Sequence, residues 1–262
     1  MIKLTRVQGP PSSPTLVLIP GGPGISSLSI RAMDILSRSF QLIYVDFPGT
    51  NGNPYDKDRS FDELANGLVQ AISNIPGEVI TVGHSHGGFF AVKAAITNKH
   101  ISGVVCISSP FTDQCFQAAV ENFRSRKTPT LIAAEKSWDA DPSDKTYALW
   151  LAEYGELYFS PEKLASGREL LANDPCSHKA FLHNQHDVKL MGALLDEFSH
   201  WQRPKLFLSE DKGMIPTSAL KKDADQGGFS FEVIQGSSHF VMFDRPEDVA
   251  RSIEKQFAAR RG

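Results

Sequence analysis

Five residues, Gly83-His84-Ser85-His86-Gly87, place a serine between two glycines. A serine hydroxyl is a weak nucleophile that a neighbouring base can activate for attack on a carbonyl carbon. Glycines two residues before and after Ser85 leave room for a sharp, strained turn that would expose its hydroxyl. The spacing indicates covalent chemistry at Ser85, although a solvated serine in a glycine-rich loop is the simpler interpretation of so short a motif.

The segments on either side of this motif predict a strand that runs into a helix. Residues 79–82 are apolar and rich in β-branched side chains, which is typical of a buried parallel strand. Residues 88–96 have apolar side chains at helical spacing. The amino end of that helix would favour negative charge developing beside Ser85.

A general base for Ser85 is predicted near the carboxyl end of the chain. A strand at 230–234 leads into a loop that contains His239, and a proline-initiated amphipathic helix follows from Pro246 to about Phe257. This context, with Gly-Ser-x-His-Phe before an Arg-Pro-Glu helix start, resembles the α/β-hydrolase family. The resemblance implies that His239 is the general base.

A glycine loop after the apolar run 16–19 could hold a developing oxyanion. Its sequence, Gly21-Gly22-Pro23-Gly24, resembles the His-Gly-Gly-Pro-Gly loop of proline iminopeptidases, with Pro20 in place of the histidine. Pro23 has no N–H to donate. We therefore expect the amide of Gly22 to pair with the amide of His86 as the oxyanion hole.

The acid that would orient His239 is harder to place. The resemblance implies an aspartate four residues before a proline within 204–216, and counting back from Pro216 reaches Lys212. We favour Asp211, because a one-residue insertion in the loop would restore it. Glu210 and Asp113 are the alternatives.

The remaining histidines have simpler interpretations. The side chains of His84 and His86 are expected to line the pocket beside Ser85. His183, His186 and Asp187 could share one helix face, but no further ligand group clusters beside them, so we expect no metal site. No cofactor is expected either.

The alternation of strands and helices predicts a single α/β fold with a mostly parallel sheet covered on both faces. An edge strand within residues 2–7 would precede strands near 15–19, 42–46, 79–82, 103–107, 204–208 and 230–234. We expect residues 1–110 and 204–262 to form the α/β-hydrolase core. Residues 111–203, which have no strand pattern, would form a helical lid (cap).

Composition narrows the classes of partner. The net charge of −3 and the absence of lysine and arginine clusters, apart from Arg260 and Arg261, indicate no nucleic-acid partner. No segment has the length and hydropathy of a membrane span or an export signal. Three cysteines, Cys106, Cys115 and Cys176, are consistent with free thiols in the cytoplasm. The oligomeric state stays open.

These features together predict a serine hydrolase that cleaves an ester or amide bond of a small molecule or short peptide. The glycine loop favours an aminopeptidase acting on N-terminal proline, followed closely by a carboxylesterase. In the first case Glu153 and Glu156 of the lid could bind the free amino terminus of the substrate. The alternative, suggested by Lys212, is a non-catalytic ligand-binding or interaction protein that lacks a working acid.

Overall fold

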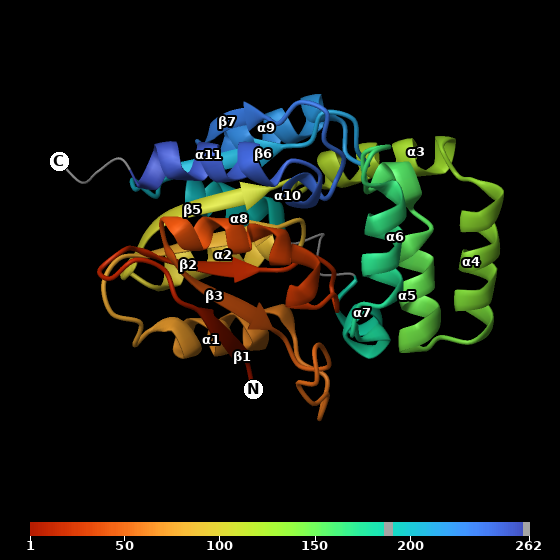
Figure 1. Ribbon diagram of the computed structural model, residues 1–262, viewed down its shortest axis with the longest axis horizontal. Coiled ribbons are helices and arrows are strands. Elements are labelled where there is room, and N and C mark those ends of the chain that lie inside the picture. Colours follow the sequence, from red (N-terminus) through yellow and green to blue (C-terminus); the bar gives the residue numbers. More distant parts are fainter. Residues whose placement is uncertain (186–190, 259–262) are drawn as a thin grey trace.

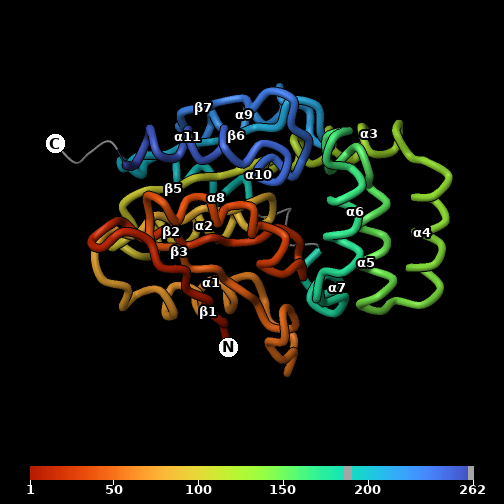
Figure 2. Tube along the Cα trace, in the orientation of Figure 1, coloured from red at the N-terminus to blue at the C-terminus, as the bar shows by residue number. Residues whose placement is uncertain are grey.

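A computed structural model of the chain describes residues 1–185 and 191–258. In this part of the chain, seven strands form one twisted sheet in the order β1-β3-β2-β4-β5-β6-β7 (Figures 1 and 2). β1 pairs antiparallel with β3 at the edge, and the other pairs are parallel. The predicted α/β-hydrolase fold and its strands are confirmed: β1 Lys3–Val7, β2 Thr15–Ile19, β3 Gln41–Asp46, β4 Val79–His84, β5 Ile101–Ile107, β6 Lys205–Ser209 and β7 Ser230–Val233.

Helices cover both faces of the sheet because its central strands are apolar on both sides. In β2, Leu16 and Leu18 face one core cluster, whereas Val17 and Ile19 face the other. The first cluster lies under η1 (Ser27–Arg38), α10 (Val241–Asp244) and α11 (Pro246–Phe257). The second lies under α1 (Phe61–Ile72), α2 (Gly87–Thr97), α8 (Met191–Ser199) and α9 (Thr217–Gly227).

The segment between β5 and β6 is helical and divides into two parts. Helices α4 to α7 project beyond the carboxyl ends of the strands (Figure 1), and we call them the cap helices. By contrast, α8 packs beside α2 and α9 and so belongs to the layer that covers the sheet. The elements of this segment before α8 are α3 (Asp113–Ser125), α4 (Pro129–Ala140), α5 (Asp144–Ala152), η2 (Gly155–Leu157), α6 (Leu164–Ala172) and α7 (His178–Asn184).

The cap segment is tied to the loop that follows β2 by a buried carboxylate. Asp174, which is 6% exposed, accepts hydrogen bonds from the amide and hydroxyl of Ser26 at 2.9 and 2.7 Å. Burial raises the pKa of Asp174 from 3.8 to about 6, and the bonds from Ser26 oppose this shift only in part. The link between cap and core therefore contains a carboxyl group whose ionised form is disfavoured by burial.

This carboxyl group should make stability depend on pH. Asp174 binds its proton more tightly in the folded chain than in the unfolded one, so its contribution to stability is complete below pH 3.8 and is lost as the pH rises through about 6. Relative to Asp174→Asn, we expect the wild-type free energy of unfolding to fall by about 2 kcal/mol between pH 4 and pH 7. Urea denaturation of both proteins across this range measures the difference, and parallel pH dependences would contradict the assignment.

Within the described residues, no helix is both long and apolar enough to cross a membrane. The three cysteines are buried and unpaired, as predicted for free thiols.

Candidate active site

Ser85 lies on the turn between β4 and α2, at the carboxyl end of the sheet. Its φ of 50° is in the left-handed region that non-glycine residues rarely adopt. Two backbone hydrogen bonds hold this conformation: the Ser85 amide donates to the Ile107 carbonyl at 2.8 Å, and the Gly88 amide donates to the Ser85 carbonyl at 3.0 Å. The strained turn expected from the pentapeptide is therefore present.

The two flanking glycines are required by close backbone approach. A Cβ on Gly83 would lie 2.2 Å from the carbonyl oxygen of Gly87, and a Cβ on Gly87 would lie 2.4 Å from the carbonyl oxygens of Ile19 and Pro20. Neither position can hold a side chain without moving the turn. The motif therefore packs the turn against the end of β2, where the glycine loop begins.

His239 and Ser85, the candidate base and nucleophile, line one cavity of about 60 Å³ together with Gly22. His239 is 2% exposed, and its ring stacks on that of Tyr158 with 5.3 Å between centroids. No hydrogen bond joins the Ser85 hydroxyl to His239 in the described structure, and such bonds are commonly long in unliganded hydrolases.

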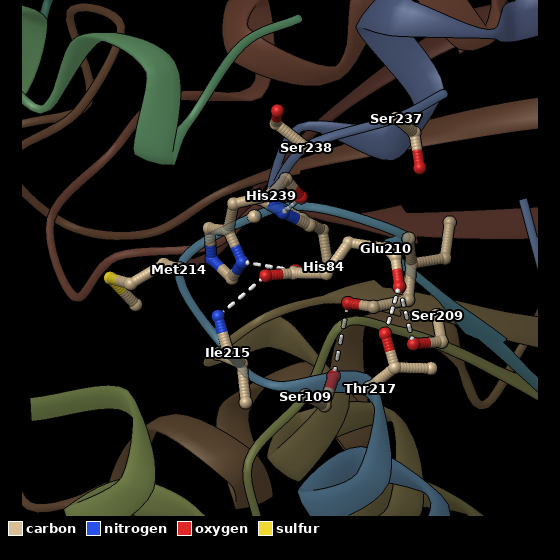
Figure 3. A network of polar contacts seen from close by, with 12 residues as sticks. His84, Ser109, Ser209, Glu210, Met214, Ile215, Thr217, Ser237, Ser238 and His239 are labelled. Atoms are coloured by element: carbon tan, nitrogen blue, oxygen red, sulfur yellow. Dashed lines mark hydrogen bonds and ion pairs between the residues drawn. The ribbon is translucent and has the colours of Figure 1, made fainter. Parts of the chain in front are cut away.

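The carboxylate that contacts His239 belongs to Glu210. Its Oε2 lies 2.9 Å from His239 Nδ1, and Figure 3 shows the two side chains facing each other. Both side chains are almost completely buried. Nδ1 is the hydrogen-bond donor in this pair if the carboxylate is ionised, which leaves Nε2 free to exchange a proton with a reacting group in the cavity.

The expected pairing of Asp211 with His239 is wrong. Asp211 accepts a hydrogen bond from the amide of Gly236 at 3.1 Å, and Asp113 is exposed in the first turn of α3. Glu210, which the sequence offered as an alternative, directly follows the last residue of β6. Its extra methylene group lets a carboxylate one residue nearer the strand reach the histidine.

The loop after β6 is shaped around the Glu210 side chain. The amide of Ile215 donates to Oε1 at 2.6 Å, so both carboxylate oxygens have a partner (Figure 3). The hydroxyls of Ser209 and Thr217 donate to the backbone carbonyl of Glu210 at 2.9 and 3.0 Å. The buried carboxylate is tolerated because the Ile215 amide and the His239 ring satisfy its two oxygens, while the two hydroxyls satisfy the backbone carbonyl.

Gly213 should be essential for this arrangement. A Cβ at this position would lie 2.3 Å from Glu210 Oε1 and 2.7 Å from the His239 amide nitrogen. We expect Gly213→Ala to displace the carboxylate and to lower kcat/KM about 100-fold, as small misplacements of reacting groups do. Gly192→Ala is the control, because a Cβ there meets nothing within 4 Å. Steady-state assays compare the two, and an active Gly213→Ala protein would contradict this account of the loop.

The glycine loop after β2 faces the Ser85 turn from the other side. Gly22 has a φ of 124°, and in the described structure neither its amide nor that of His86 donates a hydrogen bond. Two free amides near Ser85 can stabilise an oxyanion. The loop is held from the cap: Tyr147 donates its hydroxyl to the Pro23 carbonyl at 2.6 Å, and the Ser177 amide donates to the Gly24 carbonyl at 2.8 Å.

The two histidines that flank Ser85 are both buried and point to different surroundings. His84 lines the cavity with Ser85, whereas His86 packs edge-on against Phe89 and Phe90 and lines a separate cavity beyond the glycine loop. Burial lowers the pKa of His86 to about 3. His86 is therefore neutral near pH 7, and of its groups only the backbone amide is placed to act on a substrate at Ser85.

Two other groups singled out in the sequence lie away from this cavity. Glu153 is paired with Arg168, and with Glu156 it lines a neighbouring cleft of about 190 Å³. His183 lies 3.8 Å from Asp58, whereas His186 and Asp187 fall outside the described residues. In the described part of the chain, no three His, Cys, Asp or Glu side chains are grouped to hold a metal ion.

Comparison with known proteins agrees with this architecture. Residues 16–252 match the model of the Alpha/beta hydrolase family, and the chain belongs to that family. Similar solved structures include VinJ (TM-score 0.75, 17% identity, 97% of this chain and 93% of that chain) and a thermophilic esterase from Thermogutta terrifontis (0.68, 16%, 97% and 92%). A proline iminopeptidase from Mycobacterium smegmatis is also similar (0.67, 15%, 97% and 92%). Identities this low carry the fold alone. The search of curated protein sequences gave no match.

Proposed function

We propose that this protein is a serine hydrolase that cleaves esters of short, uncharged acyl groups through an acyl-enzyme on Ser85. The observation that carries the proposal is the buried contact between Glu210 and His239, whose ring lines the cavity that Ser85 also lines. An oriented base beside a serine on a strained turn is the arrangement that activates a hydroxyl nucleophile. A protein that only binds a ligand has no need of this arrangement.

The proposed reaction has two halves. Ser85 Oγ attacks the ester carbonyl as its proton passes to His239 Nε2, and the amides of Gly22 and His86 bind the resulting oxyanion. Collapse of this intermediate expels the alcohol, which takes the proton from His239. A water molecule then attacks the acyl-enzyme with the same base, which releases the acid and restores Ser85. Glu210 stabilises the imidazolium formed in each half.

The size and lining of the cavity indicate the acyl group. A cavity of about 60 Å³ is small, which favours a short acyl chain, acetyl to butyryl, over a long one. Half of the residues that line it are Phe, Tyr or Trp: Tyr147, Trp150, Tyr154, Tyr158, Phe181 and Phe240. Of the described residues in this wall, none carries a carboxylate or a permanent positive charge.

The same wall argues against an N-terminal peptide as the preferred substrate. A protonated amino terminus would need an anionic partner in the cavity. Glu153 and Glu156 line the neighbouring cleft instead, and Glu153 is already paired with Arg168. This placement favours the carboxylesterase over the aminopeptidase.

A chain-length series of p-nitrophenyl esters, run beside proline p-nitroanilide, tests the proposal. We expect kcat/KM for acetate and butyrate to exceed that for octanoate by at least about tenfold, because excess methylene groups cannot enter the cavity. A preference for the proline substrate would replace the esterase with an aminopeptidase. Absence of turnover of every substrate by the folded protein would contradict the enzyme proposal and favour the non-catalytic binding protein.

A matched pair of variants links the preference to the cavity. Phe181 lines the cavity, whereas its neighbour Leu182 is 41% exposed and lies outside it. Phe181→Ala should raise the octanoate-to-acetate ratio, and Leu182→Ala should leave it unchanged. Equal ratios in the two variants would show that this cavity does not hold the acyl chain.

A further inference from the structure

His84, the residue before Ser85, is one of the most enclosed side chains of the site. It is 3% exposed and comes from the last position of β4. Burial lowers its pKa well below the usual value, and the nearby His239 adds to this effect. The ring is therefore neutral at pH 7, with a proton on only one of its nitrogens.

The contacts of His84 identify which nitrogen carries that proton. Nε2 lies 2.9 Å from the backbone carbonyl oxygen of His239, 155 positions along the chain. A carbonyl only accepts, so Nε2 is the donor. Nδ1 has no hydrogen-bond partner among the described residues and lies against Gly21, where a Cβ would come within 3.0 Å of it.

This places the ring between the three segments that carry the proposed reaction. His84 directly precedes Ser85 in the chain, and its ring packs against Gly21 of the glycine loop. Its Nε2–H donates to the backbone carbonyl of His239, the proposed base. Its centroid is 4.9 Å from that of His239 and 4.8 Å from that of Phe240. From the cap side, the amide of Phe240 donates to the Tyr158 carbonyl at 2.9 Å.

We propose that His84 is a positioning residue: its Nε2–H bond holds the loop that carries His239, and its packing against Gly21 holds the glycine loop, so that both loops keep their positions relative to the Ser85 turn. This inference rests on the proposed function, since register matters most where a proton and an acyl group are transferred. Without the bond, the His239 carbonyl loses its buried side-chain donor and the base is free to shift. Misplacement of a reacting group by about 1 Å can lower a rate about 100-fold.

Two substitutions separate the hydrogen bond from the bulk of the ring. Glutamine can place an amide N–H near the position of Nε2, whereas the shorter asparagine cannot reach the His239 carbonyl. We expect His84→Asn to lower kcat about 100-fold with little change in KM, and His84→Gln to recover most of that loss. Thr81→Val is the control, because it removes another buried bond from β4, between the Thr81 hydroxyl and the Ala91 carbonyl, away from the cavity. It should lower Tm but not kcat.

Proton NMR gives a readout that does not depend on turnover. A His239 Nδ1–H held against Glu210 should give a low-field resonance, assigned by its absence from His239→Gln. We expect this signal to persist in His84→Gln and to be lost to exchange in His84→Asn. If the wild type shows no hydrolysis, the proposed function fails but the NMR comparison still decides the role of His84. The proposal would be overturned if folded His84→Asn kept the kcat of the wild type or kept the His239 Nδ1–H resonance. It would also be overturned if His84→Asn and His84→Gln lost kcat to the same extent.

Discussion

Replacement of Ser85 by alanine should lower kcat for the preferred ester about 10⁶-fold, to the level set by oxyanion binding alone. In the proposed mechanism the hydroxyl is the group that forms the acyl-enzyme, and alanine removes it with the smallest change of side chain. Initial-rate assays at high enzyme concentration measure the residual activity. The fold should survive, since the turn is held by backbone hydrogen bonds of the Ser85 amide and carbonyl.

Ser108 offers a matched control for this substitution. It has a φ of 47°, close to that of Ser85, and follows the adjacent strand β5, but it is completely buried outside the cavity. Ser108→Ala should therefore keep its activity. If Ser85→Ala retained substantial turnover, another nucleophile would be responsible and the proposed mechanism would be wrong.

Replacement of Glu210 by glutamine should lower kcat about 10⁴-fold, the loss seen when a buried triad acid becomes an amide. Glutamine has one acceptor oxygen where the carboxylate has two, and both are used, by His239 Nδ1 and the Ile215 amide. The amide also cannot stabilise an imidazolium. His239 would adopt the wrong tautomer or lose its orientation, while KM should change little.

The neighbouring substitution Asp211→Asn is the control for Glu210. It preserves an acceptor for the Gly236 amide and does not touch His239. We expect kcat within about threefold of wild type, since Asp211 contacts none of the reacting groups. The reverse result, a severe loss in Asp211→Asn with an active Glu210→Gln, would mean that the loop after β6 takes another register during catalysis.

The fold and two members of the site could be predicted because their signals are local. β-branched runs marked the parallel strands, and the glycines around Ser85 reflect a turn that admits no Cβ at either position. His239 could be proposed as the base because the strand before it and the proline-initiated helix after it resemble the α/β-hydrolase family. Each of these features is decided within about a dozen residues.

The acid could not be chosen by counting residues. Glu210 and Asp211 are adjacent, and what separates them is the three-dimensional path of the loop. Gly213 leaves space for the Glu210 carboxylate, and Ile215 folds back to donate to it. Gly213, three positions after Glu210, was the signal that the sequence offered for the acid. It becomes informative only once the last residue of β6 is known.

The role of His84 and the placement of the cap glutamates depend on contacts between distant segments. The His84 bond to the His239 carbonyl spans 155 positions. Glu153 lines the neighbouring cleft, where it pairs with Arg168 of α6. Such pairings arise from tertiary packing and have no local pattern in the sequence.

The central claim is that Ser85 is an activated nucleophile, and a fluorophosphonate probe tests it most directly. The purified protein would be incubated with the probe and its peptides mapped by mass spectrometry, with Ser85→Ala treated in parallel. We predict one adduct, on the peptide that contains Ser85, and none in the variant. A folded wild-type protein that forms no adduct, or forms it at another residue, would contradict the account.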